Sequence, residues 1–380
     1  MNIVVSTAAA RTSGALTIYN QFLTHLRERR DGNRYLLFVD REMPQPAMDG
    51  VEYADVDLRS WSRRILFDAS GCRELCEARG VRPDVLVSLQ NTGVRYPGVP
   101  QVIYYHNSLP FYPRRWNPLR REERPLFLYA WMYPLFVRAS LPAGADVVVQ
   151  IPFIRRGFVR RYGWPAERVH VLFPDVEEVE PSTVADYPFE PGCAHFVYPA
   201  QDFAYKEHRT LLEALKAIRR TQPELVARIR IHLTVAEGQN RRFEAAAAAG
   251  GVGACFVSHG YVAHGELLSM CKSAHGLLFP STVETLGLPL LEAASLGTAV
   301  VAADLDYAHE VLGDYPGAAY VRPRAYAEWA AAIGRLCGSA PRRFAPLRRG
   351  GPSSWERFFD LVEACGHSGE ARQENTQTQK

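Results

Sequence analysis

A single stretch decides the fold: Phe279-Pro280-Ser281-Thr282-Val283-Glu284-Thr285-Leu286-Gly287-Leu288-Pro289-Leu290-Leu291-Glu292-Ala293-Ala294. The apolar run 276–279 predicts a buried strand, and Pro289 is expected at the first position of a helix. The order is therefore strand, loop, helix. Glu284 falls in the loop and Glu292 in the first turn of the helix, so both carboxylates are expected to face one space at the positive end of the helix dipole. Such a space suits a phosphate or a polyhydroxylated group.

Outside this stretch, short apolar runs alternate with helical patterns along the chain. Strands are expected at 2–6, 34–39, 85–89, 101–105, 146–150 and 168–172, and then at 194–199, 229–235, 255–258, 276–279, 298–302 and 318–321. Helices are expected at 15–29, 71–79 and 122–139, and then at 207–221, 240–248, 265–272, 289–296, 307–312 and 325–337. This alternation predicts parallel sheets with helices on both faces. We therefore expect an α/β fold of two Rossmann-like, doubly wound domains that face one another across a ligand-binding cleft.

The domain boundaries follow from length and local composition. A chain of 380 residues exceeds what one hydrophobic core usually supports. We expect a first domain at 1–180, which an acidic, proline-containing linker separates from a second domain at 181–350. Ser353 to Glu356 resembles a capping box that opens a last helix, expected at 351–365, and the polar residues 366–380 are expected to be disordered.

Composition narrows the class of protein. Hydrophobic residues make up 47% of the chain and charged residues 22%, and no apolar run reaches the ~18 residues of a membrane-spanning helix. No secretion signal is evident, and the seven cysteines form no Cys-x-x-Cys pair. We therefore expect a cytoplasmic protein with reduced cysteines. A net charge of +3 does not favour nucleic acid as a partner.

Positive charge is concentrated between Phe111 and Trp164, where ten arginines stand against three acidic residues. The stretch includes Arg114, Arg115, Trp116, Arg120 and Arg121, and then Arg155, Arg156, Phe158, Arg160, Arg161 and Trp164. It fits a solvated face with ordinary core aromatics. It equally fits a surface that lies on an anionic membrane, where the protein would associate peripherally.

The spacing of the two glutamates leaves their roles open. Glu284 and Glu292 are eight residues apart with Pro289 between them, so they cannot be stacked partners on one continuous helix. Glu292 could accept hydrogen bonds from a diol such as a ribose, with Glu284 on a second hydroxyl or amide. Alternatively, Glu292 complements the helix dipole and Glu284 is a solvated loop residue.

The wider motif resembles a known family. Pro280-Ser281, Glu284, Gly287-Leu288-Pro289, Glu292-Ala293, Gly297, Val300-Val301, Asp304 and Glu310-Val311 closely resemble the Glu-x7-Glu donor signature of family 4 glycosyltransferases. These are retaining enzymes with the GT-B architecture, the two-domain fold expected above. The resemblance implies that Glu292 holds the nucleotide ribose. It also implies that Glu284, Thr285, Leu286, Gly287 and Leu288 contact the sugar and diphosphate of the donor.

The segment after the first strand of the second domain, 198–208, carries a further part of the resemblance. Lys206 matches a lysine that binds the donor phosphates in this family, and a cation there would be most useful as charge develops on a leaving diphosphate. Gln201 stands where the family has an arginine. The Tyr-Pro-Ala…Lys-x-His form is similar to a branch found among O-antigen and capsule enzymes. From spacing alone, an ordinary solvated lysine is the favoured interpretation of Lys206, because lone lysines are usually solvated.

Two segments of the first domain also match. His106 ends an apolar strand, where it could be an ordinary hydrogen-bonded histidine; by resemblance it approaches the donor sugar and is catalytic together with Lys206 and Glu284. Ser13 and Gly14 resemble the family's N-terminal glycine loop near donor and acceptor. The resemblance also implies that the last helix packs back on the first domain.

Together these features predict a metal-independent hexosyltransferase. It would transfer sugar from a GDP- or UDP-linked donor to a glycan or lipid-linked acceptor in bacterial surface polysaccharide assembly. No pattern of metal ligands or of a hydrolase nucleophile is present, and no cofactor is expected. Two alternatives remain open. One is another nucleotide-sugar enzyme of this fold, such as a 2-epimerase or a phosphorylase, and the other is a non-catalytic glycan-binding subunit.

Overall fold

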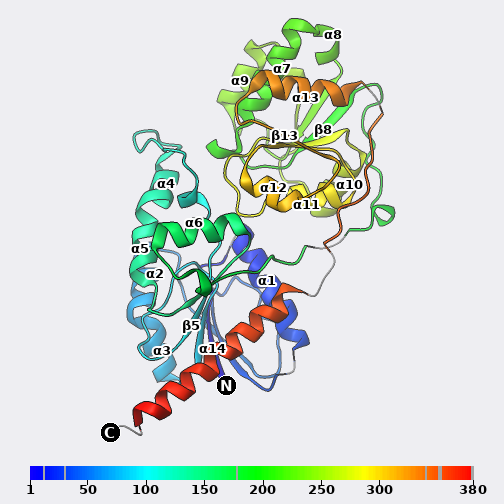
Figure 1. Cartoon of the computed structure of the whole chain (residues 1–380). Helices are drawn as coiled ribbons and strands as arrows, with labels where there is room; N and C mark the ends of the chain where they lie inside the picture. The colour runs from blue at the N-terminus through cyan, green and yellow to red at the C-terminus, as the bar shows by residue number, and fades with distance from the viewer. Residues whose placement is uncertain (12, 30, 177–178, 339, 350–352, 378–380) are drawn as a thin grey trace. The chain divides into compact units, whose positions relative to one another are not determined.

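The computed structural model describes residues 1–11, 13–29, 31–176, 179–338, 340–349 and 353–377. The chain forms two compact units (Figure 1). The first unit comprises Met1–Asp175 together with Gly351–Lys380, and the second comprises Val176–Gly350. The change of unit after Asp175 lies slightly before the boundary that we predicted after residue 180. Each unit is described by itself below.

The first unit is built on a seven-stranded parallel sheet in the order β3-β2-β1-β4-β5-β6-β7. Its strands are β1 (Asn2–Ser6), β2 (Arg34–Val39), β3 (Val51–Asp55), β4 (Val85–Ser88), β5 (Gln101–Tyr104), β6 (Asp146–Val149) and β7 (Val169–Val171). Ser6 at the end of β1 pairs with Phe38 on one side and with Ser88 on the other. The strand order reverses between β1 and β4, which is where ligands bind in sheets of this kind. We did not predict β3, an edge strand whose sequence Val-Glu-Tyr-Ala-Asp has few apolar residues.

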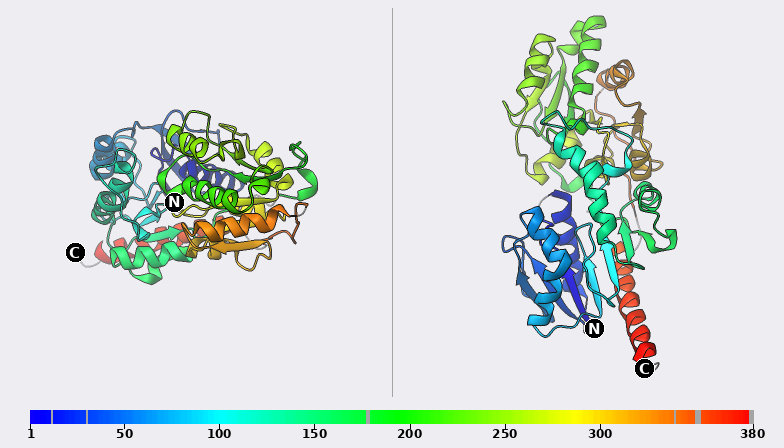
Figure 2. Two further views of the ribbon diagram at one scale, coloured as in Figure 1. Left: turned by 90° about the horizontal axis from the view of Figure 1, so that it is seen from above. Right: turned by 90° about the vertical axis from the view of Figure 1, so that its left-hand side faces the viewer.

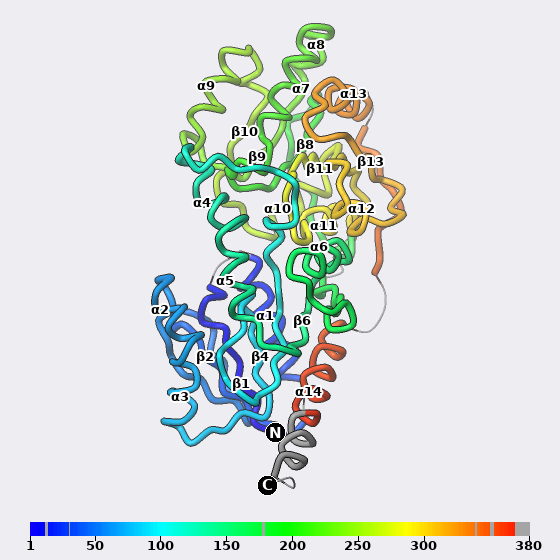
Figure 3. The backbone as a smooth tube through the Cα atoms, turned by 60° about the vertical axis from the view of Figure 1, so that its left-hand side comes forward, coloured from blue at the N-terminus to red at the C-terminus, as the bar shows by residue number. Residues whose placement is uncertain are grey.

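Helices cover both faces of this sheet (Figure 3). Alternate residues of β1 point to opposite sides, so Ile3 and Val5 join a core with α1 and α14, while Val4 joins a core with α3 and the π-helical segment before it. The helical segments are α1 (Ser13–Glu28), α2 (Trp61–Leu66), η1 (Phe67–Gly71), α3 (Cys72–Ala78), α4 (Arg124–Phe127), η3 (Leu128–Met132), α5 (Tyr133–Ser140), α6 (Pro152–Tyr162) and α14 (Ser354–Gln377).

The last helix, α14, packs against the first unit. Trp355 is buried and its ring stacks on Tyr104 of β5 at a centroid distance of 5.9 Å, while its Nε1 donates a hydrogen bond to Gln21 of α1. Ser353 accepts from the backbone N–H of Trp355, as an N-cap does. The helix continues to Gln377, whereas we expected a disordered tail from residue 366. The sequence after Gly366 contains no proline and is rich in residues with good helix propensity; residues 378–380 lie outside the described part of the chain.

The second unit repeats the design with a six-stranded parallel sheet in the order β10-β9-β8-β11-β12-β13. Its strands are β8 (Ala194–Tyr198), β9 (Ile229–Leu233), β10 (Phe256–Ser258), β11 (Gly276–Phe279), β12 (Val300–Ala303) and β13 (Ala318–Val321). Its helices are α7 (His208–Thr221), α8 (Pro223–Val226), α9 (Arg241–Ala249), α10 (His264–Ser273), α11 (Leu288–Ser295), α12 (Asp306–Leu312) and α13 (Tyr326–Cys337). α7 and α13 pack together on one face, and α10, α11 and α12 cover the other (Figures 1 and 2).

These two sheets confirm the prediction of two Rossmann-like, doubly wound parallel-sheet domains. The sequence placed most strands within one or two residues of their observed bounds because fully buried strands are short apolar runs between turn residues. The second sheet reverses its order between β8 and β11. The loops that follow these two strands are 199–207 and 280–287, and they contain most of the residues that we predicted to bind a donor.

Candidate functional site

The centre of the candidate site is an ion pair across the point where the second sheet reverses. Lys206 Nζ lies 2.6 Å from Glu284 Oε1, with only 15% and 12% of the two side chains exposed. Lys206 follows β8 and Glu284 follows β11, so adjacent parallel strands bring together residues 78 positions apart. The ammonium group also lies 5.5 Å from the ring centroid of Tyr205 and 5.7 Å from that of Phe279. The site therefore holds a cation in a sheltered place, with one carboxylate as its partner.

Backbone contacts fix the two loops to one another. The backbone N–H and the hydroxyl of Thr282 both donate to the carbonyl oxygen of Tyr205, at 2.8 Å and 3.1 Å. The hydroxyl of Tyr198, at the end of β8, donates to the carbonyl oxygen of Lys206. The backbone is therefore hydrogen-bonded on both sides of the Cα of Lys206.

Glu292 lies on α11, but not in the first turn where we placed it. The helix begins at Leu288, so Glu292 is its fifth residue and Pro289 its second. Gly287 precedes the helix with a φ of +76°, a conformation that favours glycine and lets the loop turn sharply into α11. The prediction was wrong by one helical position because a proline fits either of the first two positions equally well.

Glu292 has a partner that the sequence did not indicate. Its Oε1 lies 3.0 Å from Nε2 of His264, the first residue of α10. The carboxylate side chain is 15% exposed and the imidazole 54% exposed, so the pair sits at the surface of the unit. No local signal could reveal this contact, because it depends on how α10 and α11 pack side by side.

The remaining donor-binding candidates lie around the same two loops. Gln201 is exposed, five residues before Lys206, and Thr285 and Leu288 are half-buried. Leu286 is 5% exposed, so its side chain belongs to the core and any ligand contact would involve its backbone. The structure thus brings Lys206 and Glu284 into direct contact, and it places Glu292 on the helix that follows their loop.

His106 lies in the first unit, directly after β5. Its backbone N–H donates to Oδ1 of Asn91 at 2.6 Å, and its Nε2 lies 3.3 Å from Nδ2 of the same side chain. Since the amide oxygen is already accepting, Nδ2 is the donor toward the imidazole. Burial, and secondly the positive charge of Arg64, lowers the pKa of His106 to about 4. The imidazole is therefore neutral near pH 7.

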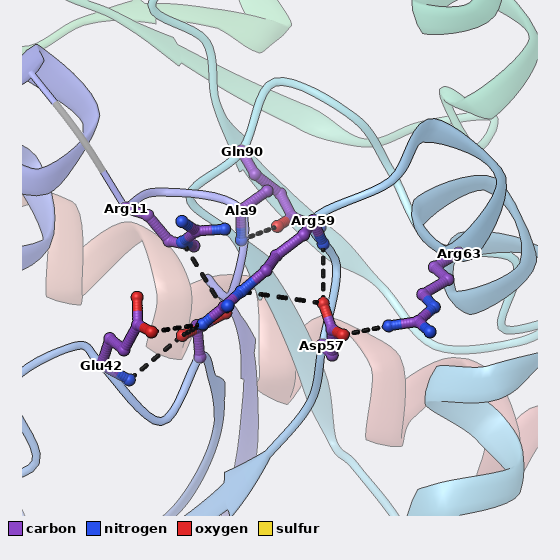
Figure 4. A network of polar contacts seen from close by, with 8 residues as sticks. Ala9, Arg11, Glu42, Asp57, Arg59, Arg63 and Gln90 are labelled. Atoms are coloured by element: carbon purple, nitrogen blue, oxygen red, sulfur yellow. Dashed lines mark hydrogen bonds and ion pairs between the residues drawn. The ribbon is translucent and has the colours of Figure 1, made fainter.

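The other first-unit candidates lie beyond the end of β1. α1 begins at Ser13, and a Cβ on Gly14 would meet no atom within 4 Å, so the backbone there is openly accessible. The preceding loop is held at both ends (Figure 4): the N–H of Ala9 donates to Oε1 of Gln90 at 3.1 Å, and Arg11 pairs with the buried carboxylate of Asp40 at 3.7 Å.

Asp40, directly after β2, is the hub of this network. Arg59 contacts it through Nε and Nη2, each at 3.3 Å, and the backbone N–H of Glu42 donates to it at 3.0 Å. The hydrogen bond from Arg59 is the largest cause that keeps the pKa of Asp40 below its ordinary value. The network ties the carboxyl ends of neighbouring strands together, and it supports the loop that leads to Ser13 and Gly14.

The basic stretch is divided between surface and core: Arg115, Arg120, Arg121, Arg156, Arg160 and Arg161 are exposed, whereas Trp116, Phe158 and Trp164 are partly or fully buried. Trp116 and Phe158 are core residues, 4% and 0% exposed, and Arg155 donates to the carbonyl oxygens of Val169 and Ala166. Leu119, in the same stretch, is 93% exposed, and a group of exposed apolar side chains lies on α2 and along η3 and α5. We call this set the aromatic face: Trp61, Ile65, Leu66, Leu128, Tyr129, Trp131, Met132 and Leu135, each at least 41% exposed.

The two parts of the aromatic face adjoin one another. The ring of Trp61 on α2 lies 5.6 Å from that of Tyr129 on η3, measured between centroids. Arg161 lies over Trp131 at 5.5 Å. No helix in the described part of the chain is long and apolar enough to cross a membrane. Within the same residues, no group of three or more His, Cys, Asp or Glu is arranged to hold a metal ion.

Comparison with known proteins supports the resemblance seen in the sequence. Residues 185–343 match the family model described as "Glycosyl transferases group 1". This segment covers most of the second unit and contains Lys206, Glu284 and Glu292. The resemblance to group 1 glycosyltransferases is thereby confirmed for the second unit.

Individual relatives are more distant. Over 72 residues the chain is 38% identical to the O-antigen chain mannosyltransferase RfbU of Salmonella typhimurium, a match that spans 19% of this chain and about a fifth (20%) of the relative. The structure of WaaG, a glycosyltransferase involved in lipopolysaccharide biosynthesis, matches with a TM-score of 0.62 at 17% identity, over 88% of this chain and 92% of WaaG. HepE of Anabaena, solved with UDP and glucose, matches with a TM-score of 0.57 at 14% identity, over 88% and 89%. These structural matches confirm the GT-B fold class.

Proposed function

We propose that this protein is a retaining glycosyltransferase that moves a hexose from a nucleotide-diphosphate donor onto a glycan or lipid-linked acceptor. The observation that carries the proposal is the Lys206–Glu284 ion pair at the strand-order reversal of the second sheet. It lies inside the segment that matches the group 1 glycosyltransferases. Glu292, the second carboxylate of the motif, stands on the helix that follows the same loop.

The chemistry follows from where the charges lie. When the bond between sugar and diphosphate breaks, negative charge grows on the phosphate oxygens, and a cation fixed beside them lowers the barrier. Lys206 is such a cation, since its backbone is hydrogen-bonded and its ammonium group is largely sheltered. Glu284 is its partner before a donor binds. When the donor binds, its diphosphate would take over part of the contact that Lys206 makes with Glu284. The carboxylate of Glu284 would then be able to accept a hydrogen bond from a hydroxyl of the sugar.

Glu292 would hold the ribose of the donor. A carboxylate can accept hydrogen bonds from both hydroxyls of a ribose, and Glu292 lies at the surface of the unit where a nucleotide could reach it. His264 contacts the same carboxylate from α10 and would keep its orientation. Gln201, in the loop after β8, would offer an uncharged amide to the phosphates in place of an arginine.

The first unit would bind the acceptor. We propose that Ser13 and Gly14 lie near the acceptor and that His106 approaches the donor sugar. A neutral His106 would act there as a hydrogen-bonding group, because with a pKa of about 4 it carries no charge near pH 7. No cofactor or metal ion beyond the donor is part of the proposal.

Surface polysaccharide assembly in a bacterium is the proposed setting. It is supported by the similarity to RfbU, an O-antigen chain mannosyltransferase, and to WaaG, a glycosyltransferase involved in lipopolysaccharide biosynthesis. The aromatic face suits the same setting, since exposed Trp and Tyr with nearby arginines are typical of a protein that lies on an anionic bilayer. We therefore propose a cytoplasmic protein that associates peripherally with the inner face of the membrane.

A screen of nucleotide sugars tests the proposal directly. GDP- and UDP-linked hexoses, GDP, UDP and free hexoses would be compared by thermal shift and saturation-transfer NMR, and binders would then be tested for transfer. We expect one nucleotide sugar to stabilise the protein and its base-matched diphosphate to compete with it. Release of free sugar from that donor without any acceptor would favour an epimerase. If no nucleotide bound at all, the remaining alternative would be a non-catalytic glycan-binding subunit.

A further inference from the structure

Among the described residues of the second unit, two that are not glycine adopt left-handed backbone conformations. Glu207 has a φ of +54° and Arg324 a φ of +60°. This region of backbone space costs a residue with a Cβ about 1–2 kcal/mol, and it is normally occupied by glycine. Such residues persist where the surroundings hold them in place.

The two strained residues hold one another. Arg324 Nη2 donates to Oε1 of Glu207 at 2.6 Å, and Nε lies 3.2 Å from each carboxylate oxygen. The Glu207 side chain is 8% exposed, so this bidentate ion pair lies in a largely buried place on the glutamate side. The arginine comes from the loop between β13 and α13, which is 117 residues further along the chain.

Glu207 occupies the one position that links Lys206 to α7. The short turn Ala204–Lys206 ends immediately before it, α7 begins at His208 immediately after it, and its carbonyl oxygen accepts from the N–H of Thr210 at 2.8 Å. Its φ therefore sets the orientation of the turn that ends at Lys206 relative to the helix α7. A change to an ordinary negative φ would alter the direction of the turn that carries Lys206 relative to α7.

We propose that the Glu207–Arg324 ion pair is a positioning device that keeps Lys206 at the β8–β11 strand reversal. Glycine would adopt the same turn without strain but would leave it free to rotate. Glutamate, held by the arginine, fixes the turn rigidly. The role of Lys206 in turnover rests on the proposed function, but its placement does not, so the two ideas can be tested separately.

Hydrogen exchange tests the placement without any activity. Amide exchange in the segment 203–212 would be followed by mass spectrometry in the wild type and in Arg324→Gln and Glu207→Ala. Both variants are expected to exchange faster there by roughly tenfold or more, because the turn opens more often. Arg322→Gln is the matched control: Arg322 lies two residues before Arg324 and makes a bidentate pair with Glu328, but both side chains of that pair are exposed, at 74% and 42%. Equal exchange in Arg324→Gln and Arg322→Gln would overturn the proposal.

A double-mutant cycle tests the link to Lys206. Arg324→Gln is expected to lower kcat by up to about 100-fold with little change in the donor KM, because a displaced catalytic group loses transition-state contact. In a Lys206→Ala background the same substitution should have no further effect on kcat. Glu207→Gly should retain more activity than Glu207→Ala, since glycine accepts the left-handed conformation.

The outcomes separate this inference from the proposed function. If Arg324→Gln lowered kcat by the same factor with and without Lys206→Ala, its effect would not pass through Lys206. The proposed positioning role would then be wrong. If Lys206→Ala itself left turnover unchanged, the proposed function would fail, whereas the exchange experiment would still decide whether the ion pair positions Lys206.

Discussion

Lys206 and Glu284 form a sheltered ion pair, Nζ to Oε1 at 2.6 Å, across two strands that are neighbours only because the sheet reverses its order there. If the lysine stabilises a leaving diphosphate, Lys206→Ala should lower kcat by about 100-fold or more and change the donor KM little. Steady-state kinetics with the donor found in the screen would measure this. Lys216→Ala is the control, because Lys216 pairs with Glu213 at 3.3 Å on α7, outside the site. Equal kinetics for the two variants would refute the role of Lys206.

The carboxylate of Glu292 should act on binding. We expect Glu292→Ala to weaken the affinity for the nucleotide diphosphate by about 10–100-fold, because hydrogen bonds to a charged group contribute about 1.5–3 kcal/mol. His264→Ala should weaken it less, since His264 acts through the carboxylate. Calorimetry with the diphosphate alone checks both variants. If Glu292→Ala bound the diphosphate with unchanged affinity, the proposal that Glu292 binds the ribose would be refuted.

His106 should make the protein less stable in acid. Its pKa of about 4 in the folded protein lies below the ordinary 6.5, so the unfolded chain takes up a proton there between pH 6.5 and 4 while the folded chain does not. The stability that a neutral His106 contributes above pH 6.5 is therefore lost as pH falls, by about 2.5 kcal/mol at pH 4.5. The His106→Gln variant should not show this loss of stability at position 106, because glutamine does not take up a proton in this pH range. Urea unfolding of both proteins at several pH values should show their free energies converging in acid, and parallel curves would contradict the prediction.

Gly287 should be intolerant of a side chain. Its φ of +76° is costly for alanine, by about 1–2 kcal/mol, and a Cβ would lie 3.2 Å from Cδ1 of Leu290. We expect Gly287→Ala to lower the free energy of unfolding by that amount and to weaken nucleotide binding, because the residue caps the N-terminus of α11. Gly334→Ala is the control within α13, where a Cβ would meet no atom within 4 Å and should stabilise the helix by about 0.5–1 kcal/mol. Thermal unfolding of both variants would separate backbone strain from a general effect of the added methyl group.

The aromatic face should bind anionic lipid. Co-sedimentation with phosphatidylglycerol vesicles is expected at low salt, and it should weaken as salt screens the arginines. Trp131→Ser with Leu135→Ser should reduce the partition coefficient by roughly tenfold or more, because both side chains are exposed on one face. Tyr261→Ser, at a residue of the second unit that is 94% exposed, is the matched control. Absence of binding at low salt would contradict the membrane proposal, as would equal binding to phosphatidylcholine vesicles.

The fold was predictable because its strands are buried on both faces. Runs such as Gly276–Phe279 stand out as continuous apolar segments and need no knowledge of their neighbours. The edge strand β3 was missed because its alternating polar residues resemble a loop. The helices α2 and α6 were also missed, since α2 is short and without buried side chains and α6 lies within the arginine-rich stretch.

The candidate site was predictable only where its residues lie next to a motif. Lys206 and Glu284 lie in loops that follow strands, and Glu292 lies on the helix after one of these loops, so their positions in the chain indicate the edge of the sheet at which they lie. His264, Asn91 and Arg324 carry no such signal, because each contacts its partner only through the packing of elements distant in sequence. The residues of the motif could therefore be identified from the sequence, whereas the residues that contact and orient them could not.

The first unit is made of two separate segments of the chain, because α14 belongs to it, and this affects how fragments of the protein can be designed. The second unit is one uninterrupted segment, Val176–Gly350, so a single fragment contains all of it. The first unit cannot be obtained by stopping after Asp175. Such a truncation removes Trp355, Phe358 and Phe359, which are at most 3% exposed, and it uncovers the apolar side of α1 and of the central strands. A usable first unit requires α14 to be joined back after Asp175 through a short linker, and the ends to be bridged are already close, because Ser353 Oγ donates to the carboxylate of Asp175 at 2.9 Å.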